Sequence, residues 1–359
     1  MRREHNYRWA YFCGSLVLPL FYILFIANLA IPTFGQDVGS EGGPMSKNLE
    51  GAFDDYYLGK LDTGIKKAKS MLTISGISQA DSIAVFEFLS VCTYAKGETF
   101  YDRAFGYLNT IADMDPCVGP MPQEFWCKQL CDKWTGLLMA KGALICTDDQ
   151  NTNLKTIAFL PFDNYSVGEY QEKLGMLSFA IAEFFAFDFA TFSGLNVVER
   201  SKLDYLLREA DLVKGGKIDQ ASAIKVGKML GAHMMVFGSI SQFDKGSSRM
   251  VARVVNVETS EIITSVSEEG KPDFNKMEKN LVKKLAEALD LELDSEVKNL
   301  LDASGSGSAE ALDSYAKGIH AMDKYDNKAA YKHFKKAYEI DKKFTRAKTK
   351  METYKPLIG

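Results

Sequence analysis

The sequence predicts an α/β domain with a mixed β-sheet, flanked on both sides by all-α segments. Within residues 154–291, short apolar runs alternate with helical patterns in the order βαβααβββα. On either side, in 49–146 and 309–352, apolar residues recur every three or four positions, as on one face of a helix. A chain of 359 residues is also long enough for two or three domains.

The composition is that of an ordinary globular protein and narrows the classes of function. Hydrophobic residues make up 46% and charged residues 25% of the chain. Lysine and arginine (43) nearly balance aspartate and glutamate (47), so the charge pattern argues against a nucleic-acid partner. The four histidines are scattered, and no zinc-ligand spacing, Walker loop or nucleophile elbow is present. We therefore expect no metal, no cofactor and no catalytic residue.

Residues 1–35 have the features of a secretory signal peptide. A basic start precedes an apolar run at 16–31, and Thr33 and Gly35 supply small residues at a cleavage site. The alternative interpretation is an uncleaved membrane anchor, because the weakly apolar stretch is long enough to span a bilayer. Both interpretations predict an exported protein.

Cysteines follow the leader in an odd number, and all of them precede residue 150. They are Cys92, Cys117, Cys127, Cys131 and Cys146. Export permits disulfides, but at least one thiol must stay free or pair between chains. Cys127 and Cys131 lie one helical turn apart, so they could bridge, bind a soft metal, or be buried as small apolar residues.

A Gly/Ser-rich linker is predicted over 36–48, before the first helical segment at 49–146. In that segment Ala104, Leu108 and Ile111 are followed by Pro116, a spacing that resembles a tetratricopeptide repeat.

A second segment with a helical pattern of apolar residues follows residue 308. A Ser/Gly run at 304–308 predicts a flexible linker, and 309–352 predicts a tetratricopeptide-like helix pair. Its aromatic stripe is formed by Tyr331, Phe334 and Tyr338. A single helix pair cannot bury its apolar face alone, so we expect this stripe to pack on the rest of the chain or on a partner.

The α/β segment contains several ordered motifs. They are NVVER at 196–200, VGKMLGA at 226–232, VFGSI at 236–240 and ARVVNVETSEI at 252–262. Together they resemble the curli-assembly transporter family, the CsgG family. The resemblance covers the α/β segment, and it implies an exported, non-enzymatic envelope protein that often forms rings.

Residues in these motifs have structural explanations. Glu199 and Arg200 join a strand to a helix, where a carboxylate is favoured by the helix dipole. Gly231 and Gly238 would permit close approach of neighbouring elements. A phenylalanine-rich helix before them, predicted over 170–192, offers a packing or partner surface at Phe184, Phe185 and Phe187. Three strands are expected after them, at 233–243, 250–257 and 261–267, before a helix at 271–291.

We therefore expect a periplasmic scaffold or adaptor that is associated peripherally with the outer membrane. It would form homo-oligomers and bind other envelope proteins or a secreted client. The first alternative is a subunit of an outer-membrane secretion channel of the curli type; the second is an enzyme with an unrecognised site. Pore-forming members of the family insert two membrane hairpins, whereas the connections at 244–249 and 268–274 are too short for them.

Overall fold

The computed structural model describes residues 44–118, 125–146, 155–209, 219–303 and 305–358. The predicted leader at 1–35 lies outside the described residues. Among the described residues, no helix combines the length and apolar character needed to cross a membrane.

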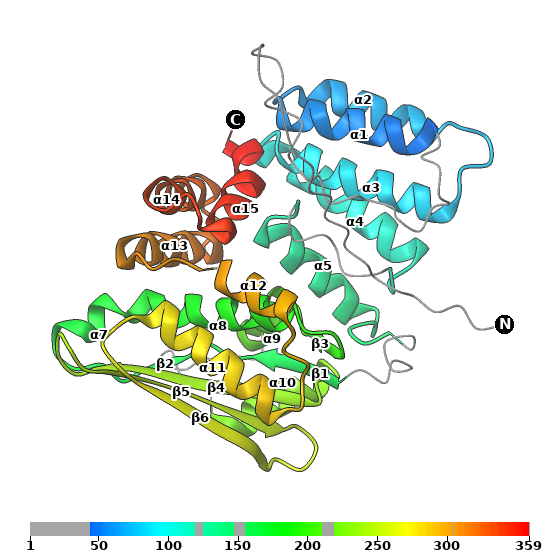
Figure 1. The fold of residues 1–359 in the computed structure, drawn as a ribbon. Coiled ribbons are helices and arrows are strands. Elements are labelled where there is room, and N and C mark those ends of the chain that lie inside the picture. Colours follow the sequence, from blue (N-terminus) through cyan, green and yellow to red (C-terminus); the bar gives the residue numbers. More distant parts are fainter. Residues whose placement is uncertain (1–43, 119–124, 147–154, 210–218, 304, 359) are drawn as a thin grey trace.

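The first part of the chain is helical, as the periodicity predicts. It contains α1 (Pro44–Tyr57), α2 (Leu61–Met71), α3 (Gln79–Tyr94), the short 3-10 helix η1 (Glu98–Phe100), α4 (Tyr101–Met114) and α5 (Lys128–Ala140). Helices α1 and α2 form one hairpin and α3 and α4 a second (Figure 1). The linker prediction over 36–48 extends too far, because α1 begins at Pro44; proline suits the first turn of a helix, where its missing N–H is not needed.

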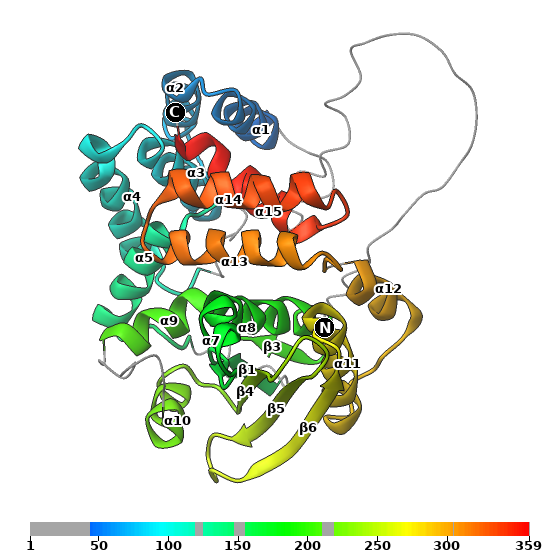
Figure 2. The same ribbon diagram turned by 90° about the vertical axis from the view of Figure 1, so that its left-hand side faces the viewer.

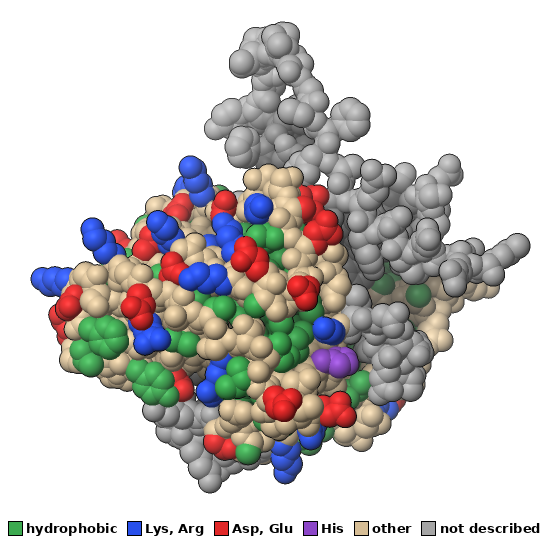
Figure 3. All heavy atoms as spheres, turned by 60° about the horizontal axis from the view of Figure 1, so that its bottom comes forward, with side chains coloured by type: hydrophobic (Ala, Val, Ile, Leu, Met, Phe, Trp, Pro, Cys, Tyr) green, Lys and Arg blue, Asp and Glu red, His purple; other side chains and the backbone are tan. Residues whose placement is uncertain are grey.

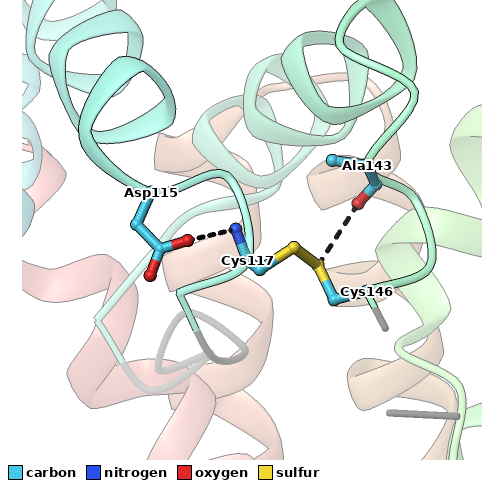
Figure 4. Close-up of a disulfide and its surroundings, with 4 residues drawn as sticks. All are labelled: Asp115, Cys117, Ala143 and Cys146. Carbon is cyan, nitrogen blue, oxygen red and sulfur yellow. Dashed lines mark hydrogen bonds between the residues drawn. A yellow bond between two sulfur atoms is a disulfide. The ribbon is translucent and has the colours of Figure 1, made fainter. Parts of the chain in front are cut away.

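A disulfide closes this helical part. It joins Cys117, just after α4, to Cys146, in the loop after α5 (Figure 4). The Asp115 carboxylate accepts a hydrogen bond from the Cys117 N–H at 2.8 Å, and the Ala143 carbonyl oxygen lies 3.9 Å from Cys146 Sγ. Cys92, Cys127 and Cys131 are free and buried, which agrees with the interpretation of them as small apolar core residues.

The α/β part has a six-stranded mixed sheet, which confirms the predicted fold class. The strands are β1 (Lys155–Phe159), β2 (Asp163–Asn164), β3 (Leu195–Val197), β4 (Met234–Gln242), β5 (Ser248–Asn256) and β6 (Ile262–Gly270). Their order is β3-β1-β4-β5-β6, with β2 paired to β4. The pairs β3/β1, β1/β4 and β2/β4 are parallel, whereas β4, β5 and β6 form an antiparallel meander.

The two faces of the sheet are covered differently. The helices of this part are α7 (Glu169–Lys173), α8 (Gly175–Phe189), α9 (Arg200–Glu209), α10 (Gln220–Met229), α11 (Phe274–Ala288) and α12 (Ser295–Ala303). Helices α8 and α11 pack on one face, and their side chains share a core with Val236 and Val254. Helices α9 and α10 pack on the opposite face against Met235 and Val255. Farther along β4 and β5, this second face is open and carries mixed charged and apolar side chains (Figure 3).

The one long helix predicted over 170–192 is instead two helices. Helix α7 ends at Lys173, Leu174 lies between the two, and α8 starts at Gly175. Helix α8 carries apolar side chains on more than one face and lies between the sheet and the C-terminal helices.

The last part of the chain contains α13 (Ala309–Asp323), α14 (Asn327–Ile340), α15 (Thr345–Tyr354) and the 3-10 helix η2 (Lys355–Ile358). Figure 2 shows α13 lying across α8, with α14 and α15 beyond it. Gly318 is required where α13 meets α14, because a Cβ there would lie 2.5 Å from Phe334 Cε1.

The segment before α13 is more ordered than a flexible linker. The Ser306 side chain is buried, and its hydroxyl donates to Asp341 Oδ2 at 2.6 Å. Ser308 caps α13 by accepting a hydrogen bond from the Ala311 N–H at 3.2 Å. The flexible-linker prediction over 304–308 is therefore wrong for the described residues 305–308, because their polar side chains are used in capping and bridging.

Candidate functional site

The phenylalanines predicted on α8 lie between two layers of the molecule. Phe185 stacks on Phe159 of the sheet, with ring centroids 6.1 Å apart. Phe184 faces the other way and packs on Tyr315 of α13 at 5.3 Å. Phe187 remains 48% exposed, although the Arg346 guanidinium lies 4.6 Å from its ring. At this surface the contacts come from the C-terminal helices of the same chain.

The aromatic stripe of α14 is split between the core and the surface. Phe334 is fully buried and packs on Tyr315 and Tyr354, at ring centroid distances of 5.2 and 5.8 Å. Tyr331 and Tyr338 are half-buried. The Lys342 ammonium lies 4.4 Å from the Tyr338 ring, so this outer face of α14 is both aromatic and basic.

A buried charge cluster joins the C-terminal helices to the α/β part. The Asp188 carboxylate on α8 accepts hydrogen bonds from Lys279 on α11 and from Arg346 on α15. Asp188 is completely buried, and Lys279 and Arg346 are nearly so. Glu278 lies 3.3 Å from the Lys279 ammonium, and burial, then the neighbouring Asp188 charge, raise the pKa of Glu278.

A second polar junction joins all three parts of the chain. The buried Asp132 carboxylate on α5 accepts from Arg208 on α9 and from the Tyr325 hydroxyl after α13, both at 2.6 Å. The Lys128 ammonium is 3.1 Å from the other oxygen of Asp132. The Lys128 N–H also donates to the Tyr354 hydroxyl at 3.3 Å. The helical, α/β and C-terminal parts are therefore joined through buried and partly buried polar contacts.

The motif residues Glu199 and Arg200 lie beside this junction. Helix α9 begins at Arg200, whose Nε lies 3.2 Å from Asp204 Oδ2. Glu199 precedes the helix and accepts a hydrogen bond from the Ser201 hydroxyl. Burial raises the pKa of Glu199, and the Ser201 hydrogen bond and nearby lysines partly oppose that rise.

The motif glycines are sterically required. A Cβ on Gly238 would lie 2.1 Å from Phe162 Cε1, inside the core beneath α8. Gly231 has φ of +65° and faces Ile145. His233, two residues after Gly231, is structural, since its Nδ1 accepts a hydrogen bond from the Thr156 N–H at 3.0 Å.

The residues that the structure describes contain no group of three or more His, Cys, Asp or Glu side chains placed to hold an ion. Burial raises the pKa of the Cys127 thiol to about 11 and that of Cys92 to about 12, so both stay protonated at neutral pH.

One pocket lies on the open sheet face, and sequence reasoning missed it. Its volume is about 380 Å³. We call it the sheet-face pocket; its lining residues come from the segment after β1, from α9, β4 and β5, and from the end of α13. They are Leu160, Pro161, Asp163, Tyr165, Arg200, Asp204, Leu207, Arg208, Phe237, Gly238, Ser239, Val251, Arg253 and Asp323. The signal in the sequence was Arg253, a charged residue inside an apolar strand.

The α/β part matches a known family. The family model described as "Curli production assembly/transport component CsgG" matches residues 150–252, where the expected resemblance to the CsgG family lies. The comparison with curated proteins found no match.

Three solved structures show weak similarity to the chain. The C-terminal domain of LpoB from Escherichia coli is 18% identical; the match covers 33% of this chain and 84% of that one, with a TM-score of 0.24. Lipoprotein GNA1162 from Neisseria meningitidis is 15% identical over 38% of this chain and 93% of that one, with a TM-score of 0.25. The LpoB C-terminal domain from Salmonella enterica is 17% identical over 37% and 91%, with a TM-score of 0.22.

Proposed function

We propose that the protein is an exported scaffold or adaptor of the cell envelope, built on a CsgG-type domain, that assists secretion or surface assembly. The observation that carries this proposal is the match of residues 150–252 to the CsgG family. The signal-peptide features of residues 1–35 agree with it. We place the protein in the periplasmic space, in peripheral association with the outer membrane.

In this proposal the protein works by binding rather than by catalysis. Contacts with α8 already occupy the inner face of the C-terminal helices. The surfaces available to partners are therefore the outer face of α14, the first helical hairpins and the open sheet face. We propose that the chain presents these surfaces as a homo-oligomer to other envelope proteins or to a secreted client.

The export step can be tested directly. The chain with its native leader is expressed in a bacterium with two membranes, and the envelope and cytosolic fractions are separated. We expect the mature protein in the envelope fraction, with an N-terminus near Gln36. The matched control, Leu24→Arg, disrupts the apolar run and should keep the protein in the cytosol with Met1 or its leader still present.

The binding role needs a separate measurement. Native mass spectrometry of the mature protein should show an oligomer, and cross-linking in cells should join it to other envelope proteins. A wild-type chain recovered from the cytosol with its leader intact would contradict the proposal.

The channel alternative makes a different prediction. A channel formed by this protein alone would require the pure protein to conduct ions across a planar bilayer. The connection from β4 to β5 is short, with the Phe243 N–H donating to the Ser247 carbonyl at 2.9 Å, and α11 begins at Phe274, soon after β6. These short connections favour the scaffold over the channel.

A further inference from the structure

We propose that the sheet-face pocket binds a small zwitterion of the amino-acid or short-peptide class. Its carboxylate would pair with Arg253 on β5, its ammonium would bond to Asp323 at the end of α13, and its side chains would lie on the apolar wall between them. This inference does not depend on export or on the envelope role.

The walls of the pocket suit a ligand with an apolar middle. Leu160 and Pro161 follow β1, and Leu207 comes from α9. Phe237 and Val251 project from neighbouring strands on the open face of the sheet. A volume of about 380 Å³ lies within the range of about 300–1,000 Å³ that small-molecule sites span. Such sites combine apolar walls with a few polar groups that orient the ligand.

Most charged groups of the pocket already have partners. Arg200 Nε lies 3.2 Å from Asp204 Oδ2. Arg208 donates to Asp132 at 2.6 Å, outside the pocket lining. These contacts satisfy two of the three arginines that line the pocket.

The remaining acidic group of interest is Asp323. The Asp163 carboxylate already accepts from the Tyr165 hydroxyl at 2.8 Å. Asp323 Oδ1, by contrast, is buried and has no hydrogen-bond partner among the described residues. Leaving a buried acceptor unsatisfied costs stability, so this atom favours a ligand that brings a donor. Burial raises the pKa of Asp323 to about 6, which still leaves it mostly ionised at pH 7.5.

The remaining basic group is Arg253. Its guanidinium carbon lies 5.2 Å from the ring of Phe237, and both residues line the pocket. The ion pairs found among the described residues do not include one for Arg253. A guanidinium presents a planar fork of donors that matches a carboxylate. The pocket thus offers one anionic and one cationic group across an apolar wall.

The test uses defined tripeptides and isothermal titration calorimetry on the full mature chain at pH 7.5. The probe is Ala-Leu-Ala with free ends, compared with N-acetyl-Ala-Leu-Ala and with Ala-Leu-Ala-amide. We expect the free tripeptide to bind and each blocked form to bind about 10- to 100-fold more weakly, as expected for the loss of one charged hydrogen bond. Free leucine, added as a separate arm, distinguishes a single amino acid from a peptide as the preferred ligand.

Two variants assign the ends of the ligand. Arg253→Gln should abolish the discrimination between carboxylate and amide, while discrimination at the amino end is kept. Asp323→Asn should abolish the discrimination between a free and an acetylated amino end, while discrimination at the carboxyl end is kept. The matched controls are Arg249→Gln and Asp313→Asn. Arg249 lies on the same strand as Arg253 but pairs with Glu269, and Asp313 is exposed on the same helix as Asp323.

Two kinds of result would overturn the proposal, once circular dichroism spectra have confirmed that each variant is folded. The proposal is overturned if the free tripeptide and leucine both fail to bind the folded wild-type chain, or if binding is indifferent to blocked ends. It is equally overturned if the two pocket variants behave like their controls.

Discussion

Replacing Asp188 by Asn should destabilise the protein more than any other single removal of charge from the buried cluster. Asp188 is the anion shared by Lys279 and Arg346, and all three side chains are buried. In Asp188→Asn two buried cations lose their common partner, and breaking a buried pair in this way costs about 3–5 kcal/mol. Glu278 can compensate in part, because loss of the adjacent negative charge removes one cause of its raised pKa.

The double variant sharpens this prediction. Adding Arg346→Met to Asp188→Asn removes one of the two cations that Asp188 binds. The double variant should therefore be more stable than the sum of the two single effects predicts. The free energy of unfolding is measured in urea by circular dichroism. Limited proteolysis around residue 305 reports separately whether α13–α15 have come away from α8.

An exposed ion pair supplies the control. Asp313 and Lys317 are 2.7 Å apart on the surface of α13, and Asp313→Asn should change stability by less than about 1 kcal/mol. The reasoning is refuted if Asp188→Asn costs no more than this control. If the changes in free energy of unfolding for Asp188→Asn and Arg346→Met were strictly additive in the double variant, this would also contradict the reasoning.

Three further predictions concern other buried features. Phe334→Ala should lower the free energy of unfolding by about 3–5 kcal/mol, because this fully buried ring fills the space between α13 and α15. The variant should be cleaved by protease near residue 305 while the α/β part stays folded. Equal protease resistance in wild type and variant would show that Phe334 does not anchor the C-terminal helices. Burial raises the pKa of Glu87 to about 7, so the folded state favours the protonated form and loses stability as the pH rises from about 4.5 through 7. Glu87→Gln should therefore stabilise the protein by about 3 kcal/mol at pH 8 and by much less at pH 5 in urea titrations, and a pH-independent effect would contradict this cause. Replacing both Cys117 and Cys146 by Ser should lower the free energy of unfolding by roughly 3–4 kcal/mol, since the disulfide closes a loop with a sequence separation of 29; thermal melts with and without a reducing agent would check this, and identical melts would exclude it.

The sequence was most informative where the physical signal is local. Apolar runs in 233–243 and 250–257 predict β4 and β5 to within two residues, because alternation of buried and exposed side chains is a property of the strand itself. The steric need for glycine at Gly238 could also be anticipated, since the motif already placed it in a crowded strand.

Features that depend on contacts between distant segments could not be predicted. Helix α15 has the sequence TRAKTKMETY, in which apolar residues are few; it is also held by Arg346, Tyr354 and their partners on other helices. The sheet-face pocket draws its lining from several segments, so no single motif marks it. The pairing of Cys117 with Cys146 is likewise a consequence of how α4 and α5 pack, which spacing alone does not reveal.

Tyr354 has a consequence for how the protein reaches its native state. Its hydroxyl accepts the hydrogen bond from the N–H of Lys128, the first residue of α5, which is synthesised 226 positions earlier. The surface of α5 that contacts the end of α15 therefore stays exposed until α15 has been synthesised and has packed on it. Contacts of such high sequence separation slow folding and prolong the lifetime of exposed apolar surface. We therefore expect a premature stop before α15 to leave apolar surface on both earlier parts exposed and prone to aggregation.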